Sequence, residues 1–504
     1  MADRVTGERL TDALVAVLAG VAATAGSFAL AGWSRDTFVV APIDARIVQL
    51  TPGPIVAFAI EEFGAAGHIL HITLALAVVV GGLGLATVAA LAVGHRAGGP
   101  PLALALSGLF VFAGLYLPTG ALQPAILGTL SAMAVVGVYA AALDPRMRSD
   151  TDGYMPDDAA RRQTLGLALG TVAYAGVGAA LGSRRESVAP TEPLDSAQRR
   201  AAEDRLSEAA ARSFESERLG GMVTPNAEFY ETDIATFDPD VEPSTWELQV
   251  TGSVDQAVSM DYYDLTGMEP EHRFVTLRCV GEELNGHKLD NALWTGVPIA
   301  EFLDRAGPSP ECGCVKVYAA DDYYQVFPLE VMETAFLAYG MNGRRLPTSH
   351  GKPARLLVPG HWGEINVKWV TEIELIDEQQ QGYWEERGWH GTGPVNTVAK
   401  LYDEGITVRD DGTVQLVGHA YAGLRGIDRV EVSTDGGDTW DDAELSEPLP
   451  DEDVWRMYRY EFQGDDRHEV VVRATDGTGA LQPREAASPY PNGASGWVSK
   501  TVDV

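Results

Sequence analysis

The stretch RFVTLRCVGEELNGHKLDNALWTGVP, residues 273–298, decides how the rest of the chain is interpreted. It opens with the strand-like run FVTLR, rich in β-branched and apolar residues, and continues into a polar loop. Cys279 stands where the run meets the loop. A thiol there can point into a site, and the neighbouring cation of Arg278 would favour the thiolate, the form that binds metal. From these residues alone, a small buried hydrophobic role for Cys279 stays open.

Composition divides the 504 residues into two parts of very different charge. Residues 1–185 contain 11 Arg, no Lys and 12 Asp plus Glu, which gives this part a net charge of −1. Because the whole chain has a net charge of −34, residues 186–504 have a net charge of −33. A soluble part this acidic is a poor partner for nucleic acid or an anionic membrane surface. Arg outnumbers Lys by 31 to 6. We therefore predict a halophilic source, with an ordinary acidic protein as the alternative.

Three cysteines, Cys279, Cys312 and Cys314, are too few for a disulfide framework. Cys312 and Cys314 flank one glycine and are interpreted as plain thiols, because no histidine pair with zinc-finger spacing accompanies them. A cysteine-protease interpretation of Cys279 would require a histidine base in a recognisable local signature, which the sequence does not show.

The first part of the chain contains five apolar runs of about the length that a membrane-spanning helix needs. They cover residues 11–32, 66–94, 101–118, 121–143 and 164–182. Flanking arginines favour a cytoplasmic N-terminus, with Arg4, Arg9, Arg96, Arg146, Arg148, Arg161 and Arg162 on that side against Arg35, Arg46, Arg184 and Arg185 on the other. We expect a membrane domain over residues 1–186 with about five transmembrane helices, and the catalytic part on the extracellular face.

His68 and His71 lie in the second run, three residues apart and so on one face of a helix. Ionisable groups inside a membrane are functional candidates. A bis-histidine haem usually takes its ligands from two helices, whereas the other histidine of this region, His95, belongs to the same run. The spacing therefore favours polar packing or a quinone contact over a b-type haem.

Three further segments follow the membrane part. Residues 187–222 are charged and Ala-rich, and they predict an exposed helical linker. Residues 223–395 mix short strands such as STWELQVTG with short helices such as VPIAEFLDRAG, which predicts an α+β domain. Residues 396–504 carry about seven strand-like runs, as expected of an immunoglobulin-like β-sandwich. Their segment STDGGDTW (433–440) resembles the Asp-box turn of sialidases, and we interpret it as structural.

Three separated motifs of the α+β domain occur in the order typical of one enzyme family. They are TLRCVGEELNG (276–286), NALWTGVPIAEFLDRAG (291–307) and LAYGMNGRRLPTSHGKPARLLVPGHWGEINVKWVTEIELID (337–377). With them, residues 223–395 resemble the sulfite oxidase family of molybdenum enzymes, and residues 396–504 resemble that family's dimerisation domain. The membrane runs in front, and TPNAEFYETD (224–233) at the start of the domain, are most similar to membrane-anchored bacterial and archaeal members.

The resemblance implies a molybdenum–molybdopterin cofactor whose metal is held by the thiolate of Cys279, and soft sulfur ligands suit such a metal. It also implies the residues that hold the cofactor: Asn226, Tyr230, Cys279, His350, Arg355, Asn366, Val367 and Lys368. The chemistry agrees, because a buried phosphate requires Arg, Lys and backbone N–H groups. The alternatives are a surface ion pair for Arg355 and a turn role for His350.

The sequence departs from the family pattern at two positions. Pro225 stands where sulfite oxidases carry Arg, and Trp389 stands where they carry Tyr. An anionic substrate requires a cationic pocket, so both departures leave the substrate open. Candidates to supply the missing charge are Arg278, His287, His361 and Arg387.

We therefore expect a membrane-anchored molybdopterin oxidoreductase that transfers an oxygen atom, in either direction, on a small sulfur or nitrogen compound. Its expected partners are the small-molecule substrate, the membrane, a quinone or haem-containing electron carrier, and a second copy of the chain; no nucleic acid is expected. The alternative from another class is a non-catalytic, membrane-anchored surface protein that keeps a degenerate molybdopterin domain for binding. A third interpretation is an electron-input subunit in which the membrane domain carries the main function.

Overall fold

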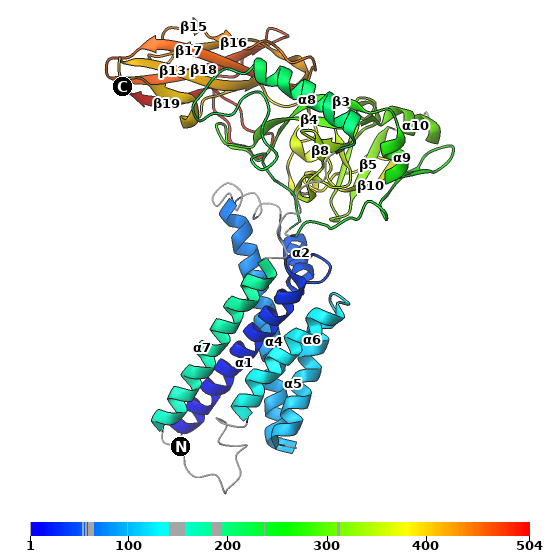
Figure 1. Cartoon of the computed structure of the whole chain (residues 1–504), viewed down its shortest axis with the longest axis vertical. Helices are drawn as coiled ribbons and strands as arrows, with labels where there is room; N and C mark the ends of the chain where they lie inside the picture. Colours follow the sequence, from blue (N-terminus) through cyan, green and yellow to red (C-terminus); the bar gives the residue numbers. More distant parts are fainter. Residues whose placement is uncertain are drawn as a thin grey trace. The chain divides into compact units, whose positions relative to one another are not determined.

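The computed structural model describes residues 2–52, 55, 58, 65–97, 99–140, 157–183, 194–235, 237–309 and 313–504. The chain forms two compact units. One contains the helices α1, α2, α4, α5, α6 and α7 together with the segment Ala235–Asp240, and the other contains α8 and the strands that follow (Figure 1). Cys312 and the side chain of His68, both discussed above, lie outside the described residues.

The first unit consists of long apolar helices that run side by side (Figure 1). Their bounds are α1 (Ala2–Ala31), α2 (Val40–Leu50), α4 (Ala65–Ala97), α5 (Gly99–Tyr116), α6 (Leu122–Val138) and α7 (Asp157–Ser183). A helix therefore occurs at each of the five predicted runs. Within the described residues, three stretches are long and apolar enough to cross a membrane: Thr11–Ala31, Ile69–Gly94 and Thr164–Ser183. Pro101–Tyr116 and Leu122–Val138 are apolar but shorter.

Small residues bring α1 close to its neighbours. A Cβ on Gly20 would lie 2.3 Å from the carbonyl oxygen of Val80 on α4, and a Cβ on Gly178 of α7 would lie 2.7 Å from the carbonyl oxygen of Ala25. Such contacts are typical of helices that associate inside membranes, where close backbone approach replaces the hydrophobic effect as the driving force. Large apolar side chains such as Leu169, which is 70% exposed, cover the outside of these helices.

The segment Ala235–Asp240 belongs to the helical unit although the sequence places it within the α+β domain. Its Phe237 is buried, stacks on Trp33 with 5.5 Å between ring centroids, and meets Phe38 edge-on at 5.9 Å. Aromatic pairs in these arrangements attract each other beyond the area that they bury. Phe237 is thus an aromatic attachment to the helices that no local sequence pattern predicts.

Helix α8 (Ser196–Ala211) corrects the prediction of an exposed linker. Its Ala202 and Ala209 are fully buried, and the amide of Gln198 donates a hydrogen bond of 2.9 Å to the Tyr339 hydroxyl. Asp195 caps its first turn by accepting hydrogen bonds from two backbone N–H groups. The charged face that the sequence shows is therefore only one side of a helix that packs on the α+β domain.

The α+β part of the second unit contains two sheets, with strand orders β2-β1-β10-β5-β6 and β3-β4-β7-β8, and β9 pairs with β7. β1 runs parallel to β10, and the other pairs are antiparallel. The strands are β1 (Glu247–Gly252), β2 (Val258–Asp261), β3 (Glu271–Arg278), β4 (Leu289–Pro298), β5 (Cys314–Ala319), β6 (Tyr324–Pro328), β7 (Phe336–Met341), β8 (Arg344–Arg345), β9 (Arg355–Leu357) and β10 (Val370–Ile376). The helices are α9 (Tyr262–Gly267), α10 (Ala300–Ala306) and α11 (Leu329–Met332), with 3-10 turns η3 (Thr348–His350), η4 (Gly363–Ile365) and η5 (Glu385–Arg387).

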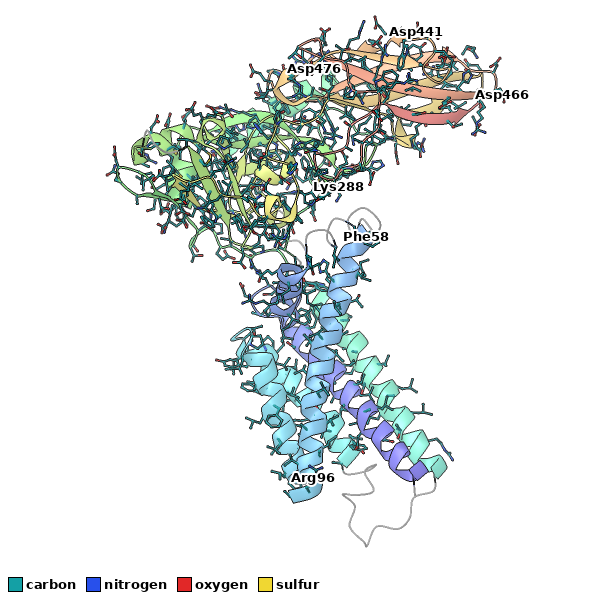
Figure 2. All side chains as sticks on the ribbon, turned by 180° about the vertical axis from the view of Figure 1, so that it is seen from behind. Phe58, Arg96, Lys288, Asp441, Asp466 and Asp476 are labelled. Atoms are coloured by element: carbon teal, nitrogen blue, oxygen red, sulfur yellow. The ribbon has the colours of Figure 1, made fainter. Side chains whose placement is uncertain are left out.

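The C-terminal domain consists of two antiparallel sheets that share one apolar core. Its strands are β11 (Val398–Lys400), β12 (Ile406–Val408), β13 (Thr413–Tyr421), β14 (Ile427–Ser433), β15 (Asp441–Asp442), β16 (Glu444–Leu445), β17 (Arg456–Gln463), β18 (Arg467–Asp476) and β19 (Val498–Asp503), and its 3-10 turns are η6 (Asp403–Gly405) and η7 (Gly423–Arg425). Acidic residues such as Asp441 and Asp466 are exposed on its surface (Figure 2). An immunoglobulin-like topology for these sheets stays a prediction.

The Asp-box segment is a turn that holds itself together, as predicted. The carboxylate of Asp435 accepts hydrogen bonds from the backbone N–H groups of Asp438 and Thr439 and from the Thr439 hydroxyl, at 2.6–3.1 Å. The hydroxyl of Ser433 accepts a bond of 2.8 Å from the N–H of Gly437. Because these polar groups satisfy one another, the motif is explained by its structural role.

Candidate functional site

Cys279 lies one residue beyond β3, as the sequence predicts. Arg278 of β3 pairs with Leu289 of β4, and the N–H of Cys279 donates to the carbonyl of Lys288 at 3.0 Å, which extends the ladder by one pair. The next residues turn back at once, because the N–H of Glu282 donates to the carbonyl of Cys279 at 3.2 Å. The thiol therefore stands at the end of a rigid hairpin and is only partly buried by exposed area.

The environment of the thiol opposes its ionisation on balance. Burial raises the pKa of Cys279, whereas the cation of Lys288, the N–H of Gly281 and the hydroxyl of Thr232 lower it. Such a thiol stays protonated until a bound metal ion replaces the proton, because coordination deprotonates a thiol outright. The same three groups would stabilise the thiolate that binds a metal.

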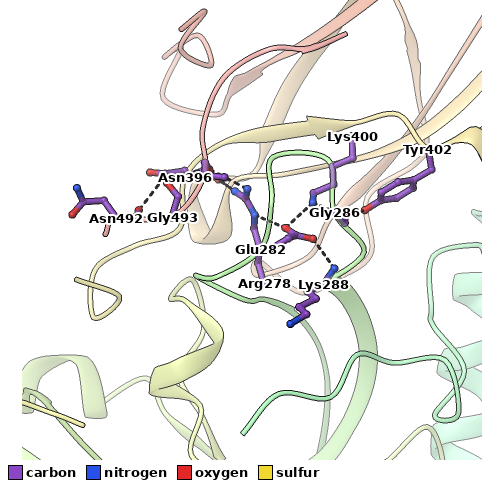
Figure 3. A network of polar contacts seen from close by, with 10 residues as sticks. Arg278, Glu282, Gly286, Lys288, Asn396, Lys400, Tyr402, Asn492 and Gly493 are labelled. Carbon is purple, nitrogen blue, oxygen red and sulfur yellow. Dashed lines mark hydrogen bonds and ion pairs between the residues drawn. The ribbon is translucent and has the colours of Figure 1, made fainter. Parts of the chain in front are cut away.

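Arg278 does not serve the thiol, which corrects the expectation from the sequence. Successive residues of a strand point to opposite faces, so Arg278 and Cys279 diverge. The Arg278 side chain is fully buried, and its guanidinium donates to Glu282 at 3.1 Å and to the carbonyls of Asn396 and Ala494 at 3.0 and 3.1 Å (Figure 3). It ties the end of β3 to the C-terminal domain.

Glu282 is the centre of a buried charge network that we call the domain seam: Arg278, Glu282 and Lys400 (Figure 3). The ammonium of Lys400 lies 2.6 Å from the Glu282 carboxylate and donates to the carbonyl of Gly286 at 2.9 Å. The second carboxylate oxygen of Glu282 accepts from the backbone N–H of Lys288 at 2.6 Å. The seam thereby fixes the loop between Cys279 and Lys288 against strand β11.

A second group consists of three basic side chains, His350, Arg355 and Lys368, which we call the basic pocket. Arg355 is 3% exposed; its guanidinium donates to the carbonyls of His350 and Asn366 at 3.3 and 3.0 Å and lies over the Trp294 ring. Lys368 forms an ion pair of 2.8 Å with Asp233. Burial and the charges of Lys368 and Arg355 lower the pKa of His350 to about 3, so its ring is neutral at physiological pH.

The remaining predicted residues surround this pocket. Asn366 is buried, donates to the carbonyl of Trp362 at 3.0 Å and accepts from the N–H of Val358 at 2.7 Å. Val367 is buried beside it, and its carbonyl accepts from the N–H of Leu356 at 2.8 Å. These bonds hold the loop before β10 in one conformation.

Asn226 and Tyr230 come from the loop that precedes the first sheet. The carbonyl of Asn226 lies 3.2 Å from the ring Nε2 of His350, and its side-chain oxygen accepts from Asn342 at 2.7 Å. The backbone N–H of Tyr230 donates to Asp290 at 2.8 Å. Burial raises the pKa of the Tyr230 phenol, so it stays a neutral hydrogen-bond donor. Asp290, which the sequence analysis missed, positions this tyrosine.

Two polar atoms of the basic pocket are buried and, within the described residues, have no hydrogen-bond partner: Nδ1 of His350 and Nε of Arg355. A buried polar atom without a partner costs about 1–3 kcal/mol, so native proteins rarely keep one. Nε of Arg355, together with the Lys368 cation, suits an anionic group such as a phosphate. Nε2 of the neutral His350 ring donates to the Asn226 carbonyl, so its Nδ1 is an acceptor and suits an N–H or O–H group of a ligand. The residues present therefore fit a molybdopterin, with Cys279 as the thiolate ligand; the individual roles stay a prediction.

The two departures from the family pattern carry no charge into the site. Pro225 begins a turn in which the N–H groups of Glu228 and Phe229 donate to the Pro225 carbonyl. Trp389 is buried, and its ring meets the Tyr490 ring edge-on with 5.2 Å between the ring centroids. The predicted substitutes also have other contacts. His287 stacks on Tyr402 at 4.4 Å, the His361 ring lies 2.9 Å from the Pro359 carbonyl, and Arg387 lies over the Tyr383 ring at 3.6 Å.

In the helical unit, Nδ1 of His71 lies 2.8 Å from the carboxylate of Asp44. Asp44 of α2 is fully buried, while the side chain of His71 is 29% exposed. The pair gives His71 a polar packing partner, one of the two roles that the spacing favours. A quinone contact stays a prediction.

Comparison with known families identifies two matches in the second unit. Residues 235–384 match the oxidoreductase molybdopterin binding domain, and residues 393–490 match the Mo-co oxidoreductase dimerisation domain. Both lie close to the ranges 223–395 and 396–504 that the sequence predicts. The helical unit lies outside both matches.

Individual proteins agree with these matches. The uncharacterized oxidoreductase YuiH of Bacillus subtilis is 31% identical over 150 residues, which cover 29% of this chain and 74% of YuiH. Mitochondrial sulfite oxidase of Mus musculus is 29% identical over 319 residues, 53% of this chain and 58% of that protein. This chain thus spans 58% of the length of that relative. The crystal structure of the sulfane dehydrogenase SoxCD from Paracoccus pantotrophus shares the fold, with a TM-score of 0.50, 22% identity, and coverage of 56% of this chain and 82% of that one.

Proposed function

Because the chain belongs to the sulfite oxidase family of molybdopterin oxidoreductases, we propose that it is a membrane-anchored enzyme that transfers an oxygen atom in a two-electron reaction on a small sulfur or nitrogen compound. The observation that carries the proposal is the basic pocket, whose His350 and Arg355 keep buried nitrogen atoms without protein partners within the described residues. A molybdopterin would satisfy both atoms, because its phosphate accepts from Nε of Arg355 and its pterin N–H groups can donate to Nδ1 of His350.

Each residue has a separate task in this proposal. When bound, the molybdenum–pterin cofactor supplies the two-electron redox and oxygen-atom-transfer chemistry. Cys279 holds the metal, and Thr232 and the Gly281 N–H stabilise its thiolate by hydrogen bonds. Arg355 and Lys368 hold the phosphate as cations, while Nδ1 of neutral His350 accepts a hydrogen bond from the cofactor. Asn226, Tyr230, Asn366 and Val367 line the same pocket through their loops.

The proposal is tested by metal content. Purified chain should contain close to one molybdenum per chain by mass spectrometry, together with an extractable pterin. Cys279→Ser should lose turnover while it keeps the fold, because a hydroxyl is a poor replacement for a soft thiolate ligand. Wild-type protein without molybdenum, or a fully active Cys279→Ser variant, would contradict the proposal. A screen of sulfite, sulfoxides and N-oxides with dye electron carriers in high salt would then identify the substrate.

We further propose that the helical unit anchors the enzyme with its second unit on the extracellular face, and that electrons pass to a quinone or a haem-containing partner. The apolar stretches of α1, α4 and α7 support anchoring. The match to a dimerisation domain supports a homodimer. Labelling of the second unit from outside intact cells would test the orientation, and light scattering of the detergent-solubilised chain would test the dimer.

A non-catalytic surface protein with a degenerate molybdopterin domain is the competing proposal. A domain that no longer binds the cofactor would be expected to lose such groups. This chain instead has a partly exposed thiol, a buried Arg355, a Lys368 in an ion pair, and two buried nitrogen atoms without partners in the described residues. These observations favour the enzyme. Absence of an extractable pterin would reverse the choice.

A further inference from the structure

Lys288 is the direct cross-strand neighbour of Cys279. The last pair of the β3–β4 ladder joins Arg278 to Leu289, and the N–H of Cys279 donates to the carbonyl of Lys288 at 3.0 Å. Directly opposite residues of an antiparallel pair place their side chains on the same face, with Cβ atoms about 5 Å apart. Arg278 and Leu289 occupy the opposite face, where both are buried. The Lys288 side chain therefore stands on the same face as the thiol.

The ammonium of Lys288 has no ion-pair or hydrogen-bond partner within the described residues, although the chain carries a net charge of −34. By contrast, Lys368 is paired with Asp233 and Lys400 with Glu282. Only the backbone of Lys288 is bound: its N–H donates to Glu282, while its side chain points away from that carboxylate (Figure 3). The side chain is partly exposed, so its charge is available to a ligand.

We propose that Lys288 is the cation that binds the substrate beside the metal-binding thiol, and that the substrate is a small oxyanion. This inference rests on the function proposed above. A substrate that reaches a metal held by Cys279 comes within range of the flexible four-carbon stem of Lys288. A cation in that place attracts an oxyanion and offers three hydrogen-bond donors, whereas a neutral S-oxide or N-oxide would gain much less.

The other cations near the thiol are already committed. Arg278 is bound within the domain seam, Arg355 belongs to the basic pocket, and Arg387 lies over the Tyr383 ring. The family's own arginine position holds Pro225. Lys288 thus supplies from the second strand of the hairpin the charge that the loop at Pro225 lacks.

The experiment uses the full-length, molybdenum-loaded chain with Lys288→Met and Lys288→Arg. We would measure sulfate binding by isothermal titration calorimetry and the KM and kcat for sulfite with a dye acceptor. Loss of one charged partner should weaken sulfate binding and raise the KM for sulfite by about tenfold or more, with little change in kcat. Lys288→Arg should retain most of the affinity for sulfate, because it keeps the positive charge.

The matched control is Lys316→Met. Lys316 is a cation of β5 that lies over Tyr318 and Tyr324 and bonds to Gln380, so its loss should leave sulfate binding unchanged. Loaded wild type that binds no sulfate, or binds it no better than Lys288→Met, overturns the Lys288 assignment and leaves the proposed function standing. Loss of molybdenum from Lys288→Met also overturns it, because the cation would then serve the cofactor. Wild type without molybdenum overturns the proposed function itself.

Discussion

The domain seam and the basic pocket both contain buried cations, but they differ in how completely those cations are bonded. In the seam, Arg278 and Lys400 share Glu282, and the remaining donors that the structure shows go to backbone carbonyls. In the basic pocket, Nε of Arg355 and Nδ1 of His350 are buried without a partner in the described residues. Burial of charge therefore does not by itself distinguish scaffold from site. Between these two clusters, the difference lies in how completely the cations and their neighbours are hydrogen-bonded.

This difference separates two kinds of energetic role. In a fully bonded charge cluster the loss of any one member destabilises the fold, because it leaves a buried charge without a partner. In an incompletely bonded cluster, some polar groups form hydrogen bonds only when a ligand binds, so these groups contribute to ligand affinity. Substitutions in the two clusters should therefore affect different measurements.

The largest effect is expected from Arg355→Gln, which tests whether the basic pocket binds the cofactor. It removes about two charge-assisted hydrogen bonds to the proposed phosphate, so molybdopterin retention should weaken roughly 1000-fold, or about 4 kcal/mol. Pterin and molybdenum content of the purified chain measure this loss. Arg473→Gln is the control, because Arg473 bonds to Glu431 in the C-terminal domain and should leave the cofactor in place. Equal cofactor loss in both variants would contradict the pocket assignment.

The next largest effect is expected from Glu282→Leu, which tests whether the domain seam stabilises the fold. It leaves Arg278 and Lys400 buried without their common partner, and should cost about 3 kcal/mol of unfolding free energy. A lower thermal unfolding midpoint of the solubilised chain would show this cost, and Glu282→Leu combined with Lys400→Met should recover part of it. Glu444→Leu removes the exposed pair with Arg459 and should cost under about 1 kcal/mol. A cost no larger than that of Glu444→Leu would refute the seam's role.

Asp453, a buried carboxyl group outside the domain seam, should make the folding stability depend on pH. Burial raises the pKa of Asp453 to about 7, while bonds from the Tyr421 hydroxyl and the Gly360 N–H lower it. The native state then binds a proton that the unfolded state releases near pH 4, so the contribution of Asp453 to stability is greatest in acid and falls as the pH rises from about 4 to 7. Over three pKa units the fall should be on the order of 4 kcal/mol.

Asp453→Asn keeps a neutral acceptor and should flatten this dependence. Unfolding midpoints of the variant and wild type give the difference when they are measured from about pH 3 to about pH 8, one unit beyond each end of the expected titration range. Because other carboxylates titrate in the same range, only the difference between the two proteins is informative. Parallel curves would show that Asp453 stays ionised throughout.

The smallest effect is expected from Ser433→Ala, which tests a neutral turn outside both charged clusters. It removes the hydroxyl that bonds to the Gly437 N–H and to Asp435, and should cost about 1 kcal/mol of stability without changing cofactor content. Thr434→Ala is the control, since its hydroxyl has no hydrogen bond in the part of the chain that the structure describes. A change in molybdenum content in Ser433→Ala would show that the C-terminal domain influences the pocket more than the comparison allows.

Local patterns predicted the position of Cys279 and the loops that carry the basic pocket, because strand alternation and family motifs are local signals. They did not predict that Arg278 faces away from the thiol, although alternation along a strand implies it. The seam could not be predicted, because Glu282 and Lys400 are distant in the sequence and meet only through the packing of two domains.

Other features required the register of the strands or the tertiary contacts. Lys288 is an ordinary loop residue until the pairing of β3 and β4 places it opposite Cys279. Phe237 reads as a residue of the α+β domain, yet it packs with Trp33 in the helical unit. Asp233 follows TPNAEFYET directly, but its partner Lys368 is far along the chain. In each case the missing information is a long-range contact rather than a residue type.

The return of Ala235–Asp240 to the helical unit makes the attachment of the enzyme bivalent. The covalent connection before α8 is one link, and the aromatic contact of Phe237 with Trp33 and Phe38 is a second. Once one link exists, the other forms at the high effective concentration of an intramolecular reaction. A protease cut between α7 and α8 should therefore leave the second unit bound to the helical unit. Its release should additionally require loss of the Phe237 ring.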